Sequence, residues 1–175
     1  MGLLLNLGAG DAPVPAAILG ERREIRVDID GAADVCADVR RLPFADGCAD
    51  VVYNSHLVEH FAEWEVVPML AEWRRVLKPG GTLQIRCPDI QSAAELIAVN
   101  GIDAALYKAH NGVMIRGQDV LFGWQPWVQE HGEPMRHKVA FDARKLAYSL
   151  HAAGFTDGEV ARDQSMYELR ATAIK

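Results

Sequence analysis

The fold is decided by the stretch LLLNLGAGD at residues 3–11. A mostly apolar run leads directly into a turn that contains Gly8 and Gly10. Buried parallel strands have such short apolar runs, and glycines at the carboxyl end of a strand let a ligand approach bare backbone. The stretch therefore predicts a buried strand that ends at a cofactor-binding turn.

The residues after this turn argue against a bound dinucleotide. A dinucleotide fingerprint has a third glycine three residues after the second, where the helix closes on the strand and directs its amides at the pyrophosphate. Pro13 takes that place here, with Ala12 and Pro15 on either side. The turn favours a cofactor without a diphosphate, and a nicotinamide-dependent oxidoreductase stays open as an alternative.

Two later segments are typical of strands that end in a carboxylate. Residues 24–27 lead to Asp28, about twenty residues past the turn, and the shorter segment 34–38 ends at Asp38. In a doubly wound sheet the carboxyl ends of the strands line the ligand crevice, where a carboxylate can accept hydrogen bonds from a ribose. Asp28 alone could equally cap a turn, and the motifs that follow decide between the two readings.

Periodicity predicts the remaining elements. A fourth strand over 49–53 precedes a helix with apolar residues at 66, 70, 73 and 77, which Pro68 can open and the Pro-Gly-Gly at 79–81 ends. A strand over 82–86, a helix from Asp89 to about residue 99 and a helix capped by Asp142 follow. Strands over 155–160 and 166–173 complete the pattern. We expect an α/β fold with a single doubly wound, Rossmann-like sheet, mostly parallel with a C-terminal antiparallel hairpin, in one domain over 1–175.

In this order the motifs resemble those of class I S-adenosylmethionine-dependent methyltransferases, particularly the small bacterial, type 11-like members. The matching pieces are the glycine turn, Asp28, Asp38 with LPF at 42–44, DVVY at 50–53 and the Glu59-His60 pair. The resemblance covers roughly the first half to two-thirds of the chain. It implies an enzyme with S-adenosyl-L-methionine as its cofactor.

The resemblance also implies a role for each matched residue. Gly8 and Gly10 would carry the methionine part of the cofactor, Asp28 the ribose and Asp38 the adenine amino group. The side chains of Leu42 and Phe44 would pack on the adenine ring, and residues 53–55 would lie under the sulfonium. The full predicted cofactor set is Asn6, Gly8, Ala9, Gly10, Asp28, Ile29, Asp38, Val39, Leu42, Asn54 and Ser55, and no metal site is expected. The chain departs from the family at Asn6, where an acidic residue is common, and it lacks the leading helix that usually covers the cofactor.

An acceptor oxygen or nitrogen must lose a proton, so a general base is expected just past the fourth strand. The candidates are His56, Glu59 and His60, with His56 expected closest to the methyl group, and each has a structural role as its alternative. The segment 101–140 adds His131 and His137 and is rich in aromatic residues. We expect it to be either a lid over the acceptor or a cover that packs its tryptophans on the sheet edge.

Composition limits the partners. The net charge of -6 and the scattered arginine pairs argue against nucleic acid as substrate. No apolar run has the length of a membrane span, and three cysteines without metal spacing are expected to be reduced, so the predicted location is cytoplasmic. We expect a small-molecule or saccharide acceptor and consider a homodimer. A NAD(P)-dependent oxidoreductase and a non-catalytic S-adenosylmethionine-binding subunit remain the alternatives.

Overall fold

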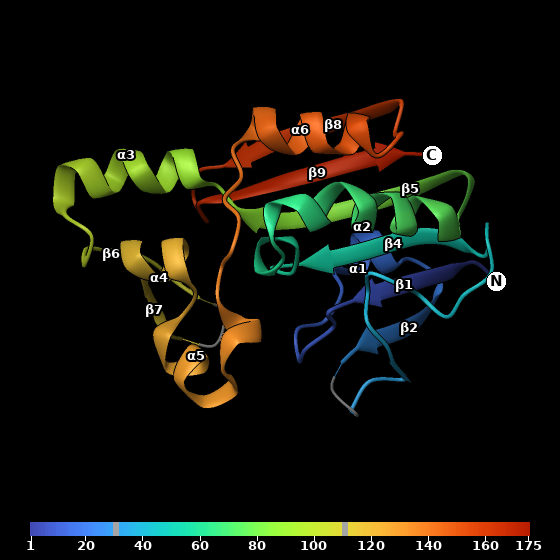
Figure 1. Ribbon diagram of the computed structural model, residues 1–175, viewed down its shortest axis with the longest axis horizontal. Helices are drawn as coiled ribbons and strands as arrows, with labels where there is room; N and C mark the ends of the chain where they lie inside the picture. Colours follow the sequence, from blue (N-terminus) through green and yellow to red (C-terminus); the bar gives the residue numbers. More distant parts are fainter. Residues whose placement is uncertain (30–31, 110–111) are drawn as a thin grey trace.

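A computed structural model describes residues 1–29, 32–109 and 112–175 (Figure 1). In this part of the chain a central sheet has the strand order β3-β2-β1-β4-β5-β9-β8. The strands are β1 (Leu3–Leu7), β2 (Arg23–Asp28), β3 (Val35–Cys36), β4 (Ala49–Ser55), β5 (Leu77–Pro88), β8 (Asp157–Asp163) and β9 (Glu168–Ile174). β1 to β5 pair in parallel, whereas β8 and β9 pair antiparallel. The predicted sheet with its C-terminal hairpin is confirmed.

The main core lies on one face of this sheet, under α2 (Glu63–Val76) and α6 (Ala143–Ala152) (Figure 1). Trp73 and Leu70 of α2 are fully buried against Leu5 and Leu7 of β1. The prediction that Pro68 opens this helix is wrong, because the helix already begins at Glu63. The Glu65 side chain accepts a hydrogen bond of 2.9 Å from the Ala62 N–H and caps the earlier start.

The opposite face carries a smaller apolar cluster. It consists of Leu4, Val14, Val51 and Tyr53, packed against residues of the single-turn helix α1 (Ala16–Leu19). The short segment 11–23 contains only this one helical turn. Side chains alternate along a strand, so this face takes every second residue of β1 and β4.

Capping residues position the later elements as predicted. Asp89 accepts a hydrogen bond of 3.1 Å from the Gln91 N–H at the start of α3 (Ile90–Asn100), and Asp142 accepts one of 2.7 Å from the Lys145 N–H in α6. β5 is longer than the predicted 82–86, because it begins at Leu77, which pairs with Ala49 before a bulge.

The 101–140 segment is compact in its described part. It contains the hairpin strands β6 (Ala105–Lys108) and β7 (Met114–Arg116), the helices α4 (Gly117–Phe122) and α5 (Gln125–His131), and the 3-10 turn η2 (Glu133–Met135). In Figure 1 it lies beyond the carboxyl ends of β1 and β4. The 3-10 turn η1 (Val58–His60) follows β4. Among the described residues, no helix has the length and apolar character that crossing a membrane requires.

Candidate active site

A cavity of about 490 Å³ opens at the carboxyl ends of β1 and β2. The strand order reverses beside β1, and a doubly wound sheet binds its ligands at such a switch point. Gly8, Gly10 and Asp28 line the cavity from the sheet, and Trp124 and Trp127 line it from the 101–140 segment. The volume is typical of a small-molecule site.

The glycine turn leaves bare backbone on the wall of this cavity. Gly8 has φ +61°, and a Cβ there would lie 2.6 Å from Leu57 Cδ1. Gly10 has φ +44°, and a Cβ there would meet no described atom within 4 Å. The Asp28 carboxylate accepts hydrogen bonds from the N–H groups of Gly10, at 3.2 Å, and Ile29, at 2.7 Å. Asp28 therefore shapes the turn and lies in the cavity lining as well.

Asp38 joins Asp28 in the lining of the same cavity. Its carboxylate contacts the Arg40 guanidinium at 2.6 Å, and Arg40 contacts Glu65 of α2 at 2.5 Å. The hydrogen bonds from Arg40 hold the pKa of Asp38 below its ordinary value. The sequence placed both carboxylates beside one ligand, and the two strand ends do bring them to one cavity.

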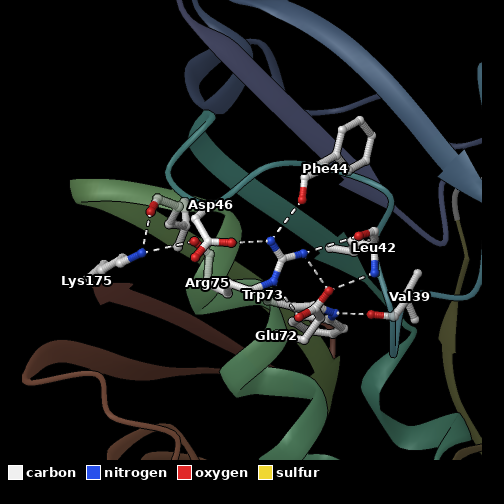
Figure 2. A network of polar contacts seen from close by, with 9 residues as sticks. Val39, Leu42, Phe44, Asp46, Glu72, Trp73, Arg75 and Lys175 are labelled. Carbon is white, nitrogen blue, oxygen red and sulfur yellow. Dashed lines mark hydrogen bonds and ion pairs between the residues drawn. The ribbon is translucent and has the colours of Figure 1, made fainter.

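Helix α2 holds the loop that follows Asp38, as Figure 2 shows. The Trp73 indole donates a hydrogen bond of 2.9 Å to the Val39 carbonyl oxygen. Glu72 accepts one of 2.8 Å from the Leu42 N–H. Arg75 donates to the carbonyl oxygen of Phe44 at 2.8 Å and to that of Leu42 at 3.2 Å. These contacts fix the backbone beside the cavity from outside it.

Two residues expected to form the adenine wall, Leu42 and Phe44, belong to or pack against the main core. Leu42, which is 4% exposed, belongs to it, and Phe44 packs against it. Neither residue is among the described residues that line the cavity. The apolar lining comes instead from Ile29, Val39 and Leu57.

Four other predicted cofactor residues lie outside the cavity lining in the described part: Asn6, Ala9, Asn54 and Ser55. Asn6 is on the opposite face, where its amide donates a hydrogen bond of 2.8 Å to Glu24. Asn54 is fully buried at the end of β4, and neither its amide nitrogen nor its amide oxygen has a described hydrogen-bond partner. A buried amide of this kind normally has a partner.

His56 lies in the cavity between two carboxylates. Its Nδ1 is 3.4 Å from Glu59 Oε1, and its Nε2 is 3.6 Å from Glu168 Oε2. Removal from water acts to lower the pKa of His56, but the carboxylates of Glu168 and Glu59 outweigh it and raise the pKa to about 10. A histidine that is protonated at neutral pH has no free lone pair, so this geometry disfavours His56 as the general base.

Glu59, His60 and His137 form a cluster at the same end of the cavity. Glu59 is 2% exposed, and His60 and His137 line the cavity. The two rings meet edge to face with centroids 4.9 Å apart. Sequence reasoning selected each of these residues but gave no signal that His137 joins the other two. His131 lies on α5 against Trp127, and the described cavity lining does not include it.

Comparisons with known proteins agree with this geometry. Residues 5–85 match a family model described as a methyltransferase domain. A S-adenosylmethionine-dependent methyltransferase from Aquifex aeolicus superimposes with a TM-score of 0.58 at 14% identity, covering 99% of this chain and 81% of that chain. No curated protein matches the sequence.

Two further solved structures share the fold. One is the 1,6-didemethyltoxoflavin-N1-methyltransferase of Burkholderia thailandensis with bound 1,6-didemethyltoxoflavin and S-adenosylhomocysteine, with a TM-score of 0.60, 18% identity and coverage of 99% of this chain and 71% of that chain. The other is a Haloferax volcanii complex between the Trm112 methyltransferase activator and a methyltransferase, with a TM-score of 0.61, 15% identity and coverage of 99% and 82%.

Proposed function

We propose that this chain is a class I S-adenosylmethionine-dependent methyltransferase that transfers a methyl group to a small-molecule or saccharide acceptor. One observation carries the proposal. A single cavity contains the glycine turn with Asp28 and Asp38 at one end and aromatic residues of the 101–140 segment at the other. Cofactor and acceptor can therefore meet in the same cavity.

The cofactor end fits the parts of S-adenosylmethionine. The backbone at Gly10 is open to the cavity, so the methionine part can lie on it. Asp28 can accept hydrogen bonds from the ribose hydroxyls. The Asp38 oxygens already accept four hydrogen bonds from Arg40, so accepting the adenine amino proton would require one of these bonds to be released. Val39 supplies an apolar wall for the base. When bound, S-adenosylmethionine supplies an electrophilic methyl group, whose transfer depends mainly on holding donor and acceptor in contact.

The acceptor end suits a flat or ring-shaped molecule. Tyr107, Trp124, Trp127 and Met135 offer apolar surfaces, and His60 and Asp119 add polar groups. Such a lining matches small-molecule sites, which are mostly apolar with a few placed polar groups. We therefore assign the 101–140 segment the role of a lid over the acceptor.

Ligand binding to the native state tests the cofactor assignment by raising the melting temperature. We expect S-adenosylhomocysteine and S-adenosylmethionine to raise it, and NAD and NADP to leave it unchanged. The Asp28→Ala variant should lose the S-adenosylhomocysteine shift while its own melting temperature falls by only a few degrees, because the hydrogen bonds of Asp28 are exposed. Asp34→Ala is the matched control, since Asp34 also accepts a backbone hydrogen bond at this sheet edge, from Arg26, but lies outside the cavity lining. An unchanged shift in Asp28→Ala would remove Asp28 from the site.

Transfer of a labelled methyl group separates the enzyme from a subunit that only binds the cofactor. The acceptors to be offered are small hydroxylated aromatic molecules and saccharides. Binding of S-adenosylhomocysteine without transfer to any of them would favour the non-catalytic alternative, in which a partner such as the activator of the Haloferax volcanii neighbour completes the enzyme. Light scattering on the purified chain tests the predicted homodimer, and the cytoplasmic location stays a prediction.

A further inference from the structure

We infer that Glu59, His60 and His137 form a binding site for a divalent transition-metal ion at the acceptor end of the cavity. One potential ligand atom from each of the three side chains lies within 4.8 Å of the other two. The binding of the ion is argued from these side chains alone, whereas the role given to it below rests on the proposed function.

Backbone contacts between two distant segments build the cluster. The N–H groups of Lys138, at 2.8 Å, and Val139, at 3.2 Å, both donate to the carbonyl oxygen of Glu59. The chain around residue 137 is thereby held against η1, which carries Glu59 and His60. The three side chains meet because the backbone brings them together.

The Glu59 carboxylate could act as a metal ligand. It is buried, and neither of its oxygens has a hydrogen-bond partner in the part of the chain that the structure describes. Burying an ionised carboxylate is costly, so buried charges are normally paired or coordinate metals. His56 Nδ1 lies 3.4 Å from Oε1, and its Nε2 lies 3.6 Å from Glu168, which also contacts Arg170.

Both histidines are oriented as metal ligands are. His60 Nδ1 lies 3.2 Å from the Arg136 carbonyl oxygen, and His137 Nδ1 lies 2.8 Å from that of Val120. A carbonyl oxygen only accepts, so each Nδ1 carries the proton and each Nε2 keeps its lone pair. His137 Nε2 is 4.0 Å from Glu59 Oε1. Metal-ligating histidines typically donate their second nitrogen to a backbone carbonyl in this way.

Two imidazoles and one carboxylate select the class of ion. This donor set suits zinc and neighbouring first-row metals, whereas calcium and magnesium prefer oxygen ligands. Tetrahedral ligands at about 2.1 Å from the metal lie about 3.4 Å apart. Binding would therefore draw the side chains together by about 1 Å and would leave a coordination position toward the cavity, which His60 and His137 line.

An ion at this position gives the acceptor end a way to activate a hydroxyl group. The hydroxyl oxygen would occupy the open position, and its proton would pass to water because the ion lowers the hydroxyl pKa. The oxygen would then be the nucleophile that accepts the methyl group. This role does not depend on a side chain acting as the base.

Metal-binding measurements on the purified chain test the site. After treatment with EDTA, we titrate the protein with Co²⁺, follow its visible absorption bands and count bound Zn²⁺ by elemental analysis. We expect one ion per chain, and a loss of affinity of about 100-fold or more in His60→Ala and His137→Ala. His151→Ala, an exposed histidine on α6, is the matched control and should bind as the unmodified chain does. No binding by the unmodified chain, or equal binding by all variants, would overturn the inference.

A second set of measurements distinguishes loss of the metal site from misfolding. It also distinguishes failure of the metal site from failure of the proposed function. Glu59→Gln keeps the shape of the side chain but removes its charge, so it should lose the ion and still show the melting shift with S-adenosylhomocysteine. A variant that shows this shift is folded, which makes its loss of metal meaningful. Metal binding without methyl transfer to any acceptor would contradict the proposed function only. Methyl transfer that EDTA leaves unchanged would contradict the role of the ion.

Discussion

At the scale of single residues, the two glycines of the turn differ in what surrounds them. A Cβ at Gly8 would clash with Leu57, whereas a Cβ at Gly10 would enter open space on the cavity wall. Both have positive φ, which costs a residue with a side chain about 1–2 kcal/mol. A substitution at Gly8 should therefore affect mainly stability, and a substitution at Gly10 should affect mainly ligand binding.

We expect Gly8→Ala to lower the free energy of unfolding by about 2–3 kcal/mol, because the Leu57 clash adds to the backbone cost. Gly10→Ala should lower it by only about 1 kcal/mol but weaken S-adenosylhomocysteine binding at least tenfold, at about 1.4 kcal/mol. Urea unfolding and calorimetric titration measure the two quantities. Equal losses of stability, or unchanged affinity in Gly10→Ala, would contradict this account of the turn.

The residues that sequence could predict are those whose role is local. Gly8, Gly10, Asp28 and Asp38 sit at strand ends that the apolar pattern reveals, and all four line the cavity. The position of Leu42 in the main core could not be predicted, since its backbone is held by hydrogen bonds from a helix thirty or more residues away in the chain. The meeting of His60 with His137 depends equally on a long-range contact.

At the scale of elements, Asp89 connects α3 to the C-terminal hairpin. Its carboxylate is 1% exposed, accepts a hydrogen bond of 2.6 Å from Ser92 and contacts Arg162 of β8 at 2.7 Å. Burial acts to raise the pKa of Asp89, but the hydrogen bonds from Ser92 and Arg162 outweigh it and lower the pKa below 3.8. One side chain therefore caps a helix and holds a strand.

This lowered pKa predicts a pH-dependent contribution to stability. A group whose pKa is lower in the folded state stabilises the fold above its unfolded pKa, and this contribution is lost as the pH falls through the folded pKa. Asp89→Asn, which cannot ionise, should cost about 2 kcal/mol at pH 7, and the difference should shrink as the pH drops below 3.8. Urea unfolding of both proteins between pH 3 and pH 7 measures it. A difference that stays constant with pH would assign the effect to packing.

The elements themselves follow the sequence closely where caps and apolar stripes agree. Asp89 and Asp142 begin helices as predicted. The prediction from Pro68 was wrong because proline is usual in the first turn of a helix. Here the Glu65 side chain caps an earlier start, and the helix continues through the proline. The sequence of residues 101–140 shows no hydrophobic periodicity of a helix or a strand, because its helices and strands are short.

At the scale of the whole molecule, the candidate active-site cavity depends on two structures that are separate in the chain. The sheet supplies the end proposed for the cofactor, and the 101–140 segment, beyond the strand ends in Figure 1, supplies the opposite wall. If that segment is a lid over the acceptor, its tryptophans should affect acceptor binding and leave the cofactor unaffected. If it is only a cover for the sheet edge, they should affect stability alone.

Trp124→Ala distinguishes these alternatives, because Trp124 lines the cavity and packs against Trp127 at a centroid distance of 6.1 Å. We expect kcat/KM for the acceptor to fall at least tenfold, through lost apolar contact worth about 1.4 kcal/mol or more, with the S-adenosylhomocysteine melting shift unchanged. Trp64→Ala removes an 82% exposed indole from α2, outside the cavity lining, and should leave both quantities as they are. Unchanged kcat/KM in Trp124→Ala together with a lower melting temperature would make the segment a structural cover.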